Sequence, residues 1–91
     1  KTTSIEALYK MINGQAEILE FLVFKDRWYL NTALRDLKLV KNVLIAAIVR
    51  KNEIIIPHGK DMLRLDDRII VFTKATVLSN LDEAFVVQEQ R

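Results

Sequence analysis

The stretch from Val43 to Phe72 constrains the fold more than any other part of the chain. It contains three apolar runs rich in β-branched residues (VLIAAIV, EIII and RIIVF), with polar segments between them. Short apolar runs bounded by turn residues are typical of strands in a sheet. Lys51-Asn52 separates the first two runs, and asparagine accepts the left-handed backbone of a two-residue hairpin turn. The stretch therefore predicts a hairpin followed by a wider connection to a third strand.

The sequence also indicates where these strands begin and end. Pro57 cannot donate a ladder hydrogen bond, so we expect the second strand to cover residues 53–56 and to end there. The first strand, residues 43–49, is apolar on both faces and predicts an interior position in the sheet. The acidic turn before residues 68–73 predicts the start of a further strand. An earlier alternating segment, residues 16–24, predicts one more.

Helical spacing appears at the start of the chain. Apolar residues recur every three or four positions over residues 4–12, and Thr3 and Glu6 have the spacing of a capping box. Asn13-Gly14 follows and tolerates the positive φ of a helix end. We therefore expect a helix over residues 4–12.

Two further segments predict helices and complete the expected fold. Residues 30–39 fit a brief helix capped by Asn31 or Thr32, and residues 75–84 fit a final amphipathic helix. Residues 86–87 fit either a short strand or a docked tail. Clustered strands between helices predict an α+β domain, with a small sheet of about four strands flanked by helices.

Composition limits the class of protein. The 91 residues suffice for one small domain, and 51% of them are apolar. Cysteine is absent, so the chain has no disulfide and no thiol ligand, which suits a reducing cytosol. Basic and acidic residues are interspersed at a net charge of +2, so we expect no nucleic-acid partner.

The ends of the chain bear on its organisation. No apolar run approaches the ~20 residues that span a bilayer, and the start KTTSIEA has no apolar signal-peptide region. The first residue is Lys1 rather than methionine. We expect one domain over residues 1–91, with a core from about residue 5 to 85, cut from a longer protein.

The sequence gives no support to catalysis. It contains no nucleophile beside a base and no cluster of metal-ligand residues. Gly14 and Gly59 are the only glycines, so no G-x-G-x-x-G dinucleotide loop can exist. We expect a binding or assembly module that is not an enzyme and carries no cofactor of its own.

A series of motifs, in order, gives the chain its resemblance to a known family. They are Leu34-x-x-Leu37, LIAAIVR, the turn Lys51-Asn52, IIIPHG, Met62-Leu63 and DDRIIVF, with AEILEF before them and VLSNLDEAF after them. The chain resembles the C-terminal regulatory subdomain of RCK/TrkA-type potassium-transport proteins, called TrkA-C. Two departures are Asn52 and Asp66, where the family often has glycine; both tolerate a left-handed backbone.

The resemblance implies a cytoplasmic module that reaches the membrane only through a partner. Members of this family follow a nucleotide-binding subdomain and pair with a second copy of themselves. Some bind a regulatory ligand, such as cyclic di-AMP, that changes ion flux through a membrane potassium transporter subunit. The resemblance therefore implies a two-fold homodimer and a regulatory cyclic dinucleotide.

Candidate ligand-binding residues lie on and after the predicted hairpin. Arg50 is either a solvated strand-end cation or an anion-binding group at a dimer cleft. His58 is a turn residue or a ligand contact. Three successive isoleucines cannot share one face, so one side of that strand is expected to pack against a partner. The full candidate set is Arg50, Asn52, Ile54, Ile55, Ile56, Pro57 and His58.

Two other functions remain open at this point. The same features suit a purely structural dimerisation domain that binds no ligand. A small RNA-binding module, using Lys25, Arg27, Trp28 and Tyr29, is the weaker alternative because a single basic–aromatic cluster is a poor nucleic-acid signal.

Overall fold

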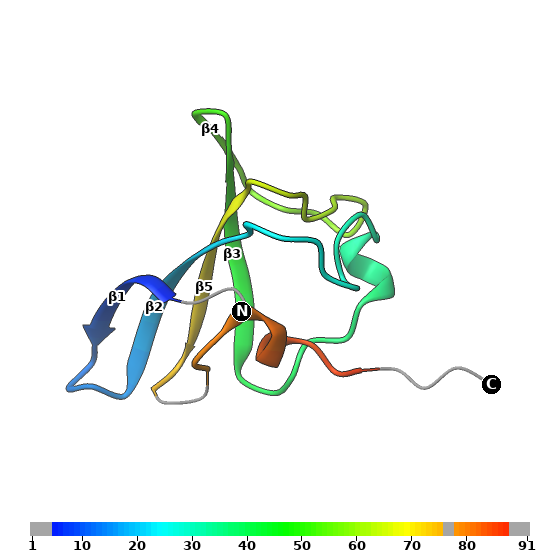
Figure 1. Ribbon diagram of the computed structural model, residues 1–91. Coiled ribbons are helices and arrows are strands. Elements are labelled where there is room, and N and C mark those ends of the chain that lie inside the picture. Colours follow the sequence, from blue (N-terminus) through cyan, green and yellow to red (C-terminus); the bar gives the residue numbers. More distant parts are fainter. Residues whose placement is uncertain (1–4, 76–77, 88–91) are drawn as a thin grey trace.

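A five-stranded antiparallel sheet forms the framework of the protein (Figure 1). The computed structural model describes residues 5–75 and 78–87. The strand order in the sheet is β1-β2-β5-β3-β4, so β5 lies between the two hairpins. The strands are β1 (Ile5–Met11), β2 (Ala16–Leu22), β3 (Val43–Arg50), β4 (Glu53–Ile55) and β5 (Arg68–Lys74).

The turn of the β3–β4 hairpin has the predicted geometry. Lys51 and Asn52 adopt φ angles of 49° and 69°, and Arg50 pairs with Glu53 across the turn. Two successive positive φ angles match the twist of the flanking strands. The predicted end of the second strand near Pro57 is also confirmed, because β4 stops at Ile55.

The interior position of β3 is confirmed as well. It pairs with β5 on one side and with β4 on the other. The register with β5 shifts between Ile45 and Ala47, which leaves Ala46 as the extra residue of a bulge. Because β4 pairs only with residues 48–50, the outer edge of residues 43–47 has no strand partner among the described residues.

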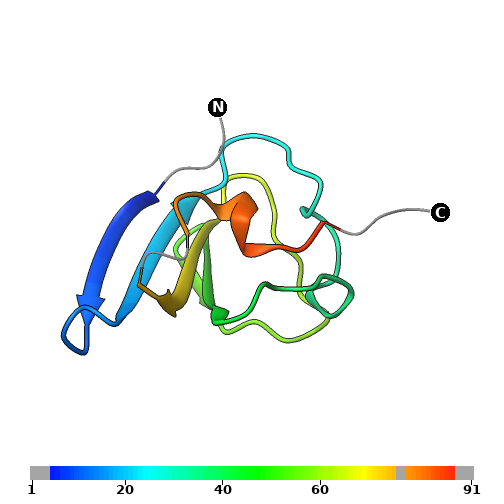
Figure 2. The same ribbon diagram turned by 90° about the horizontal axis from the view of Figure 1, so that it is seen from below.

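One face of the sheet carries the core. Leu19, Phe21, Val71, Ile69 and Ile48 are fully or almost fully buried on this face. The connecting segments gather on the same side of the sheet (Figures 1 and 2). Removing this apolar surface from water is the main favourable term for such a small sheet.

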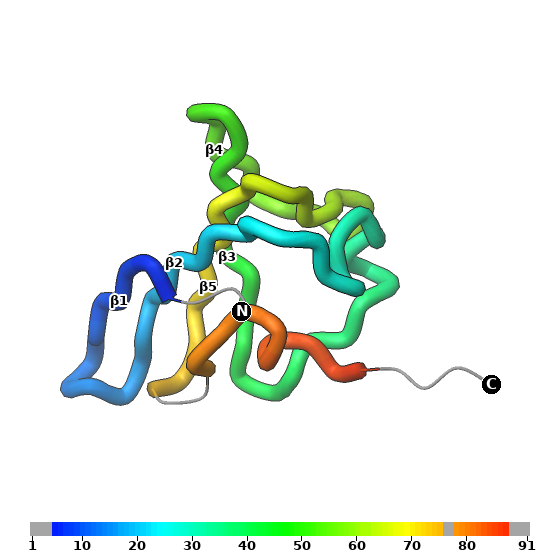
Figure 3. Tube along the Cα trace, viewed as in Figure 1, coloured from blue at the N-terminus to red at the C-terminus, as the bar shows by residue number. Residues whose placement is uncertain are grey.

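Main-chain hydrogen bonds tie the covering segments together without regular helices. Asn31 N donates to the Leu63 carbonyl at 2.8 Å, and Arg35 N donates to the Gly59 carbonyl at 2.8 Å. The C-terminal segment joins them, since Val40 N donates to the Ala84 carbonyl at 2.9 Å. These segments run beside one another across the core (Figure 3).

The predicted first helix is wrong, because its residues form β1. An isolated helix of this length is marginal in water, whereas pairing with β2 supplies backbone hydrogen bonds on one side of the whole segment. The expected helix stop is the hairpin turn: Ile12, Asn13 and Gly14 have φ angles of 54°, 54° and 80°. Thr3 of the predicted capping box lies outside the described residues.

The other two predicted helices are reduced to single 3₁₀ turns. Residues 30–39 contain only η1 (Leu34–Asp36), which starts after Ala33 and is capped by neither Asn31 nor Thr32. Residues 78–84 contain only η2 (Leu81–Ala84), where Asn80 accepts from Glu83 N; residues 76–77 lie outside the described part. A small sheet is confirmed, but it has five strands and no flanking α-helix in the described ranges. In those ranges no helix is long and apolar enough to cross a membrane.

Candidate functional site

Arg50 closes β3 and is held by an acidic side chain that precedes β5. Its Nε and Nη2 atoms donate to the two carboxylate oxygens of Asp67, each at 2.8 Å. Nη2 also donates to the carbonyl of Met62 at 2.9 Å. This two-point pairing fixes the plane of the guanidinium.

Asp67 is almost completely buried, with 1% of its surface exposed. Its carboxylate also accepts from Arg64 N at 2.8 Å, so three donors compensate its burial. The hydrogen bond to Asp67 raises the pKa of Arg50, against the opposing effect of desolvation. Arg50 is therefore a charged structural anchor, and only its Nη1 atom has no acceptor among the described residues.

A basic pocket of about 240 Å³ lies beside this ion pair. Arg50, Lys51 and Arg64 supply three cations to its lining, while Asp66 and Asp67 supply carboxylates. Asp67 is already occupied by Arg50, so the unpaired cations leave the pocket suited to an anion. No group of metal-ligating side chains occurs in the part of the chain that the structure describes.

The three isoleucines of the hairpin alternate as a strand requires. Ile54 and Ile56 are 71% and 66% exposed, whereas Ile55 packs against the core. This alternation is what the sequence predicted. Partner burial of the exposed side chains stays a prediction.

Pro57 and His58 line a different pocket of about 220 Å³. Its walls are mostly apolar and include Leu44 and Phe85, and Arg35 is the charged residue besides His58 in the lining. The His58 side chain is 78% exposed, with Nδ1 3.8 Å from an oxygen of the Asp61 carboxylate. The His58 backbone N–H donates to that carboxylate at 2.6 Å.

The candidate residues are thus divided between two pockets. Arg50 lines the basic pocket and Pro57 and His58 line the apolar one, and the two linings share no residue. Asn52 lines neither and serves the hairpin turn. Within one chain the set does not form a single site.

Sequence reasoning missed three charged residues around these pockets: Asp67, Arg64 and Arg35. Asp67 was assigned only to a turn. The signal that could have found it is its place directly before an apolar strand, where an acidic side chain can face an arginine at the end of a neighbouring strand. Arg35 reaches its pocket because Gly59 leaves room for it: a Cβ on Gly59 would lie 3.1 Å from the Arg35 Cβ. Neither proximity is visible before the chain is folded.

The proposed RNA-binding cluster is engaged within the protein. Arg27 donates to both oxygens of Asp82, at 3.1 and 2.6 Å, and Tyr29 Oη donates to the same carboxylate at 2.6 Å. Tyr29 is fully buried and stacks on Phe85 with ring centroids 4.4 Å apart. The pairing with Asp82 raises the pKa of Arg27. These side chains fasten the C-terminal segment to the core.

Comparisons with known proteins agree on one family. The family model of the TrkA-C domain matches residues 18–86. A Trk system potassium uptake protein TrkA homolog of Archaeoglobus fulgidus is 39% identical over 85 residues, covering 93% of this chain and 19% of that protein. The TrkA homolog 2 of Methanosarcina mazei is 31% identical over 72 residues, covering 79% of this chain and 16% of that protein.

A solved structure of an RCK domain with cda has the same fold, with a TM-score of 0.55 and 36% sequence identity. The match covers 65% of this chain and 81% of that one. This chain spans less than a fifth of the curated relatives named above, at 19% and 16% of their lengths. The family model covers well over half of the chain, and on that basis this chain belongs to the TrkA-C domain family.

Proposed function

We propose that this chain is the regulatory ligand-sensing and dimerisation module of a potassium-uptake system. The observation that carries the proposal is its membership of the TrkA-C family, together with curated relatives that are named potassium uptake proteins. In this role the chain is non-catalytic and forms one domain of a longer protein. It acts in the cytoplasm and reaches the membrane through a potassium transporter subunit.

The ligand is a small anion bound where two copies meet around the β3–β4 hairpin. The basic pocket lined by Arg50, Lys51 and Arg64 supports an anionic ligand. Pro57 and His58 supply a second, apolar surface for a ring. A cyclic dinucleotide carries both phosphates and flat bases, and a structure of an RCK domain at 36% identity was solved with cda.

Regulation follows from a shift between two arrangements of the dimer. A ligand that spans both copies stabilises the arrangement that it fits better. Its effect on transport is limited to the difference between its affinities for the two arrangements. Because Asp67 holds Arg50 in place, the arginine meets the ligand already oriented.

Isothermal titration calorimetry with cyclic di-AMP tests this function. We expect saturable heat with the wild type and at least a tenfold weaker affinity with Arg50→Ala. Lys38→Ala, which removes an exposed cation outside both pockets, is the matched control and should bind as the wild type does. A short linear oligoadenylate of the same charge tests whether the response is specific. Heats that do not saturate with any nucleotide would contradict the ligand-sensing role.

A structural dimerisation domain without a ligand is the second candidate. The pairing of Arg50 with Asp67 favours it, because that pairing already uses two of the three guanidinium nitrogens. Sedimentation that shows a dimer, together with calorimetry that shows no binding of any nucleotide, would support this candidate against the first.

A further inference from the structure

The C-terminal segment, residues 78–87, contributes a wall to the apolar pocket. Phe85 belongs to the lining of this pocket of about 220 Å³, together with Pro57 and His58. Phe85 is only 4% exposed, whereas the His58 side chain is 78% exposed. Phe85 is therefore part of the inner wall of the pocket, and His58 is part of its rim.

The ring of Phe85 packs against two other aromatic rings. It stacks on Tyr29 with centroids 4.4 Å apart and an interplanar angle of 22°, and it lies edge-on to Trp28 at 6.2 Å. Trp28 and Tyr29 are edge-on to each other at 5.6 Å. Neither of these two residues lines the pocket. The three rings thus connect the inner wall to side chains that a ligand in the pocket would not touch.

The carboxylate of Asp82 joins this aromatic stack to the C-terminal segment. It accepts from Tyr29 Oη at 2.6 Å and from Arg27 at 3.1 and 2.6 Å. The Asp82 carbonyl also accepts from Phe85 N at 3.3 Å, so Asp82 and Phe85 belong to one turn. Asp82 does not line the pocket. Any effect of Asp82 on a ligand there would therefore act through the position of Phe85.

Backbone contacts dock the segment beside the same pocket. Val86 N donates to the Lys38 carbonyl at 2.8 Å. The next residue, Leu39, forms an isolated bridge with Phe85 and also lines the pocket. Undocking the segment would therefore break these contacts and remove the inner wall of the pocket in one step.

We propose that Phe85 is a ligand-contacting residue and that the C-terminal segment docks more tightly when the apolar pocket is filled. This inference rests on the proposed function, because that function places a flat ring of the ligand against Pro57 and His58. A ring in this pocket also buries apolar surface of Phe85, and that contact is lost when the segment undocks. The ligand therefore binds the docked form more tightly, and its occupancy shifts the segment toward that form.

The position of the segment gives this coupling a consequence for regulation. The C-terminal segment lies at the end of the domain away from the β3–β4 hairpin (Figures 1 and 2). A ligand held between two copies at the hairpin acts directly on that end of the domain. Tighter docking of the C-terminal segment carries the effect of the ligand to the other end.

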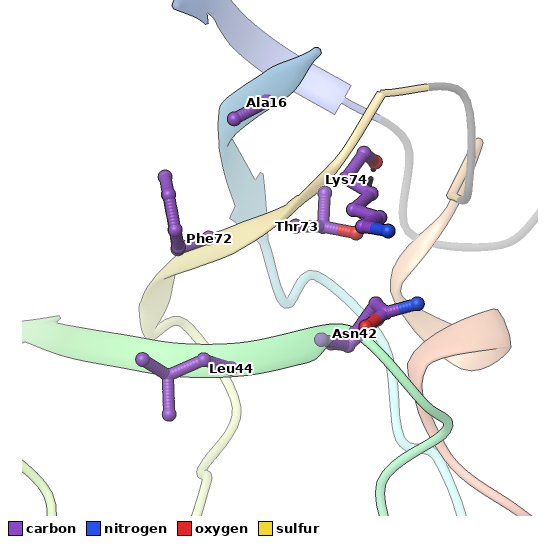
Figure 4. Close-up of a pocket in the computed structure, with 7 residues that line it drawn as sticks. Ala16, Asn42, Leu44, Phe72, Thr73 and Lys74 are labelled. Atoms are coloured by element: carbon purple, nitrogen blue, oxygen red, sulfur yellow. Dashed lines mark hydrogen bonds between the residues drawn. The ribbon is translucent and has the colours of Figure 1, made fainter. Parts of the chain in front are cut away.

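A larger hollow of about 300 Å³ offers a contrasting place for an anion. Residues at the ends of β2, β3 and β5 line it, and Lys74 supplies a cation (Figure 4). It shares Leu44 with the apolar pocket but includes no residue of the C-terminal segment. A ligand bound in this hollow would leave Phe85 and Trp28 unaffected. A response of the C-terminal segment therefore distinguishes the two places.

Hydrogen exchange of the intact protein measures docking of the segment directly. The amides of Val40 and Val86 form the bonds that join the segment to the chain before β3. With saturating cyclic di-AMP we expect both amides to exchange about fivefold or more slowly. The amide of Gly14, which donates to the Met11 carbonyl in the β1–β2 turn, is the internal control and should exchange at an unchanged rate.

The emission of Trp28, the only tryptophan, is the second readout. It is excited at the red edge of its absorption, where adenine does not absorb, while the heat of binding is recorded on the same samples. We expect the emission to saturate with the same midpoint as the heat. Saturable heat without a change in exchange or emission would overturn this inference and leave the ligand-sensing function intact. Heat that does not saturate would overturn both.

Two matched variants separate positioning from contact. Asp82→Asn and Glu20→Gln each convert a carboxylate that pairs with an arginine into an amide, but only Asp82 is linked to Phe85. We expect Asp82→Asn to bind cyclic di-AMP about threefold or more weakly, because less of the protein has the segment docked. Glu20→Gln should bind as the wild type does. Tyr29→Phe, a milder loss in the same network, should weaken binding by a smaller factor.

The variants are compared only after circular dichroism shows that each retains the sheet. Saturating ligand should restore slow exchange of the Val86 amide in Asp82→Asn, which a merely structural role of Asp82 would not produce. Equal affinities of Asp82→Asn and Glu20→Gln would show that the C-terminal segment is not coupled to the ligand and would overturn the inference.

Discussion

The guanidinium of Arg50 meets three oxygen acceptors, two on Asp67 and one on Met62. Pairing with Asp67 raises the pKa of Arg50, so the stability that depends on the charge of Arg50 is present at neutral pH and up to the ordinary pKa of arginine. That stability is lost as the pH rises through the still higher value in the folded protein. The pair therefore stabilises the fold across the whole physiological range.

Replacing Arg50 with leucine should destabilise the fold because it leaves the buried Asp67 carboxylate without its charge partner. We expect a loss of about 2–4 kcal/mol in the free energy of unfolding, measured by urea denaturation. The double variant Arg50→Leu/Asp67→Leu should recover most of that loss, since neither charge is then buried alone. A single variant within about 0.5 kcal/mol of the wild type would show that Asp67 is solvated in the folded protein.

At the same scale, the sequence located Arg50 at the end of a strand but did not reveal its pairing with Asp67. A strand-end arginine can be found by reading the chain, because Arg50 directly follows an apolar run. Its partner Asp67 is 17 residues away, and the two meet only because β5 inserts beside β3. Ligand contacts of Arg50 remain a prediction for the same reason: they depend on a second copy as well.

Among the elements, the β3–β4 hairpin was predictable because its signals are local. Asn52 in the turn and Pro57 after the strand act within a few residues of themselves. The helix predicted over residues 4–12 was wrong because the apolar residues of this segment fit both the 3.6-residue period of a helix and the two-residue period of a strand. Pairing with β2 decided the outcome, and it placed Ile12, a β-branched residue, at a positive φ of 54° that sequence rules disfavour.

The C-terminal segment is the element that depends most on one carboxylate. Asp82 lies in η2 and receives Arg27 and Tyr29 from the segment that follows β2. Phe85, directly after η2, stacks on Tyr29 and lies edge-on to Trp28 at 6.2 Å. Breaking the contacts of Asp82 should therefore loosen the cover of the core.

Asp82→Ala should lower the free energy of unfolding more than Tyr29→Phe does. Tyr29→Phe removes the part-buried hydrogen bond to Asp82, a loss of about 1 kcal/mol, and leaves the ion pair between Arg27 and Asp82. Asp82→Ala removes both contacts. It should also shift the emission of Trp28, the only tryptophan, to longer wavelength as Phe85 moves away. Equal losses for the two variants would mean that Arg27 does not help to hold the segment.

For the whole molecule, the family could be predicted from the order of the motifs, whereas the sheet could not. The strand order places β5 between β2 and β3, a non-local arrangement that periodicity cannot reveal. Ile18, Phe72 and Leu44 become neighbours only in the folded sheet, so the sequence pointed to partner burial on β4 alone.

Dimerisation should make the thermal stability of the whole molecule depend on its concentration, because a dimer that unfolds to two chains is stabilised by mass action. A tenfold rise in concentration adds about 1.4 kcal/mol per dimer, or ~0.7 kcal/mol per chain. For a domain of this size that corresponds to a rise in Tm of about 3–6 °C, an upper value reached if the folded monomer is scarcely populated. Scanning calorimetry over a hundredfold range of concentration should show this slope in the wild type, and a Tm that is independent of concentration would contradict the dimerisation role. Saturating cyclic di-AMP should raise the Tm of the wild type further, and a Tm that does not change with this ligand would contradict the ligand-sensing role.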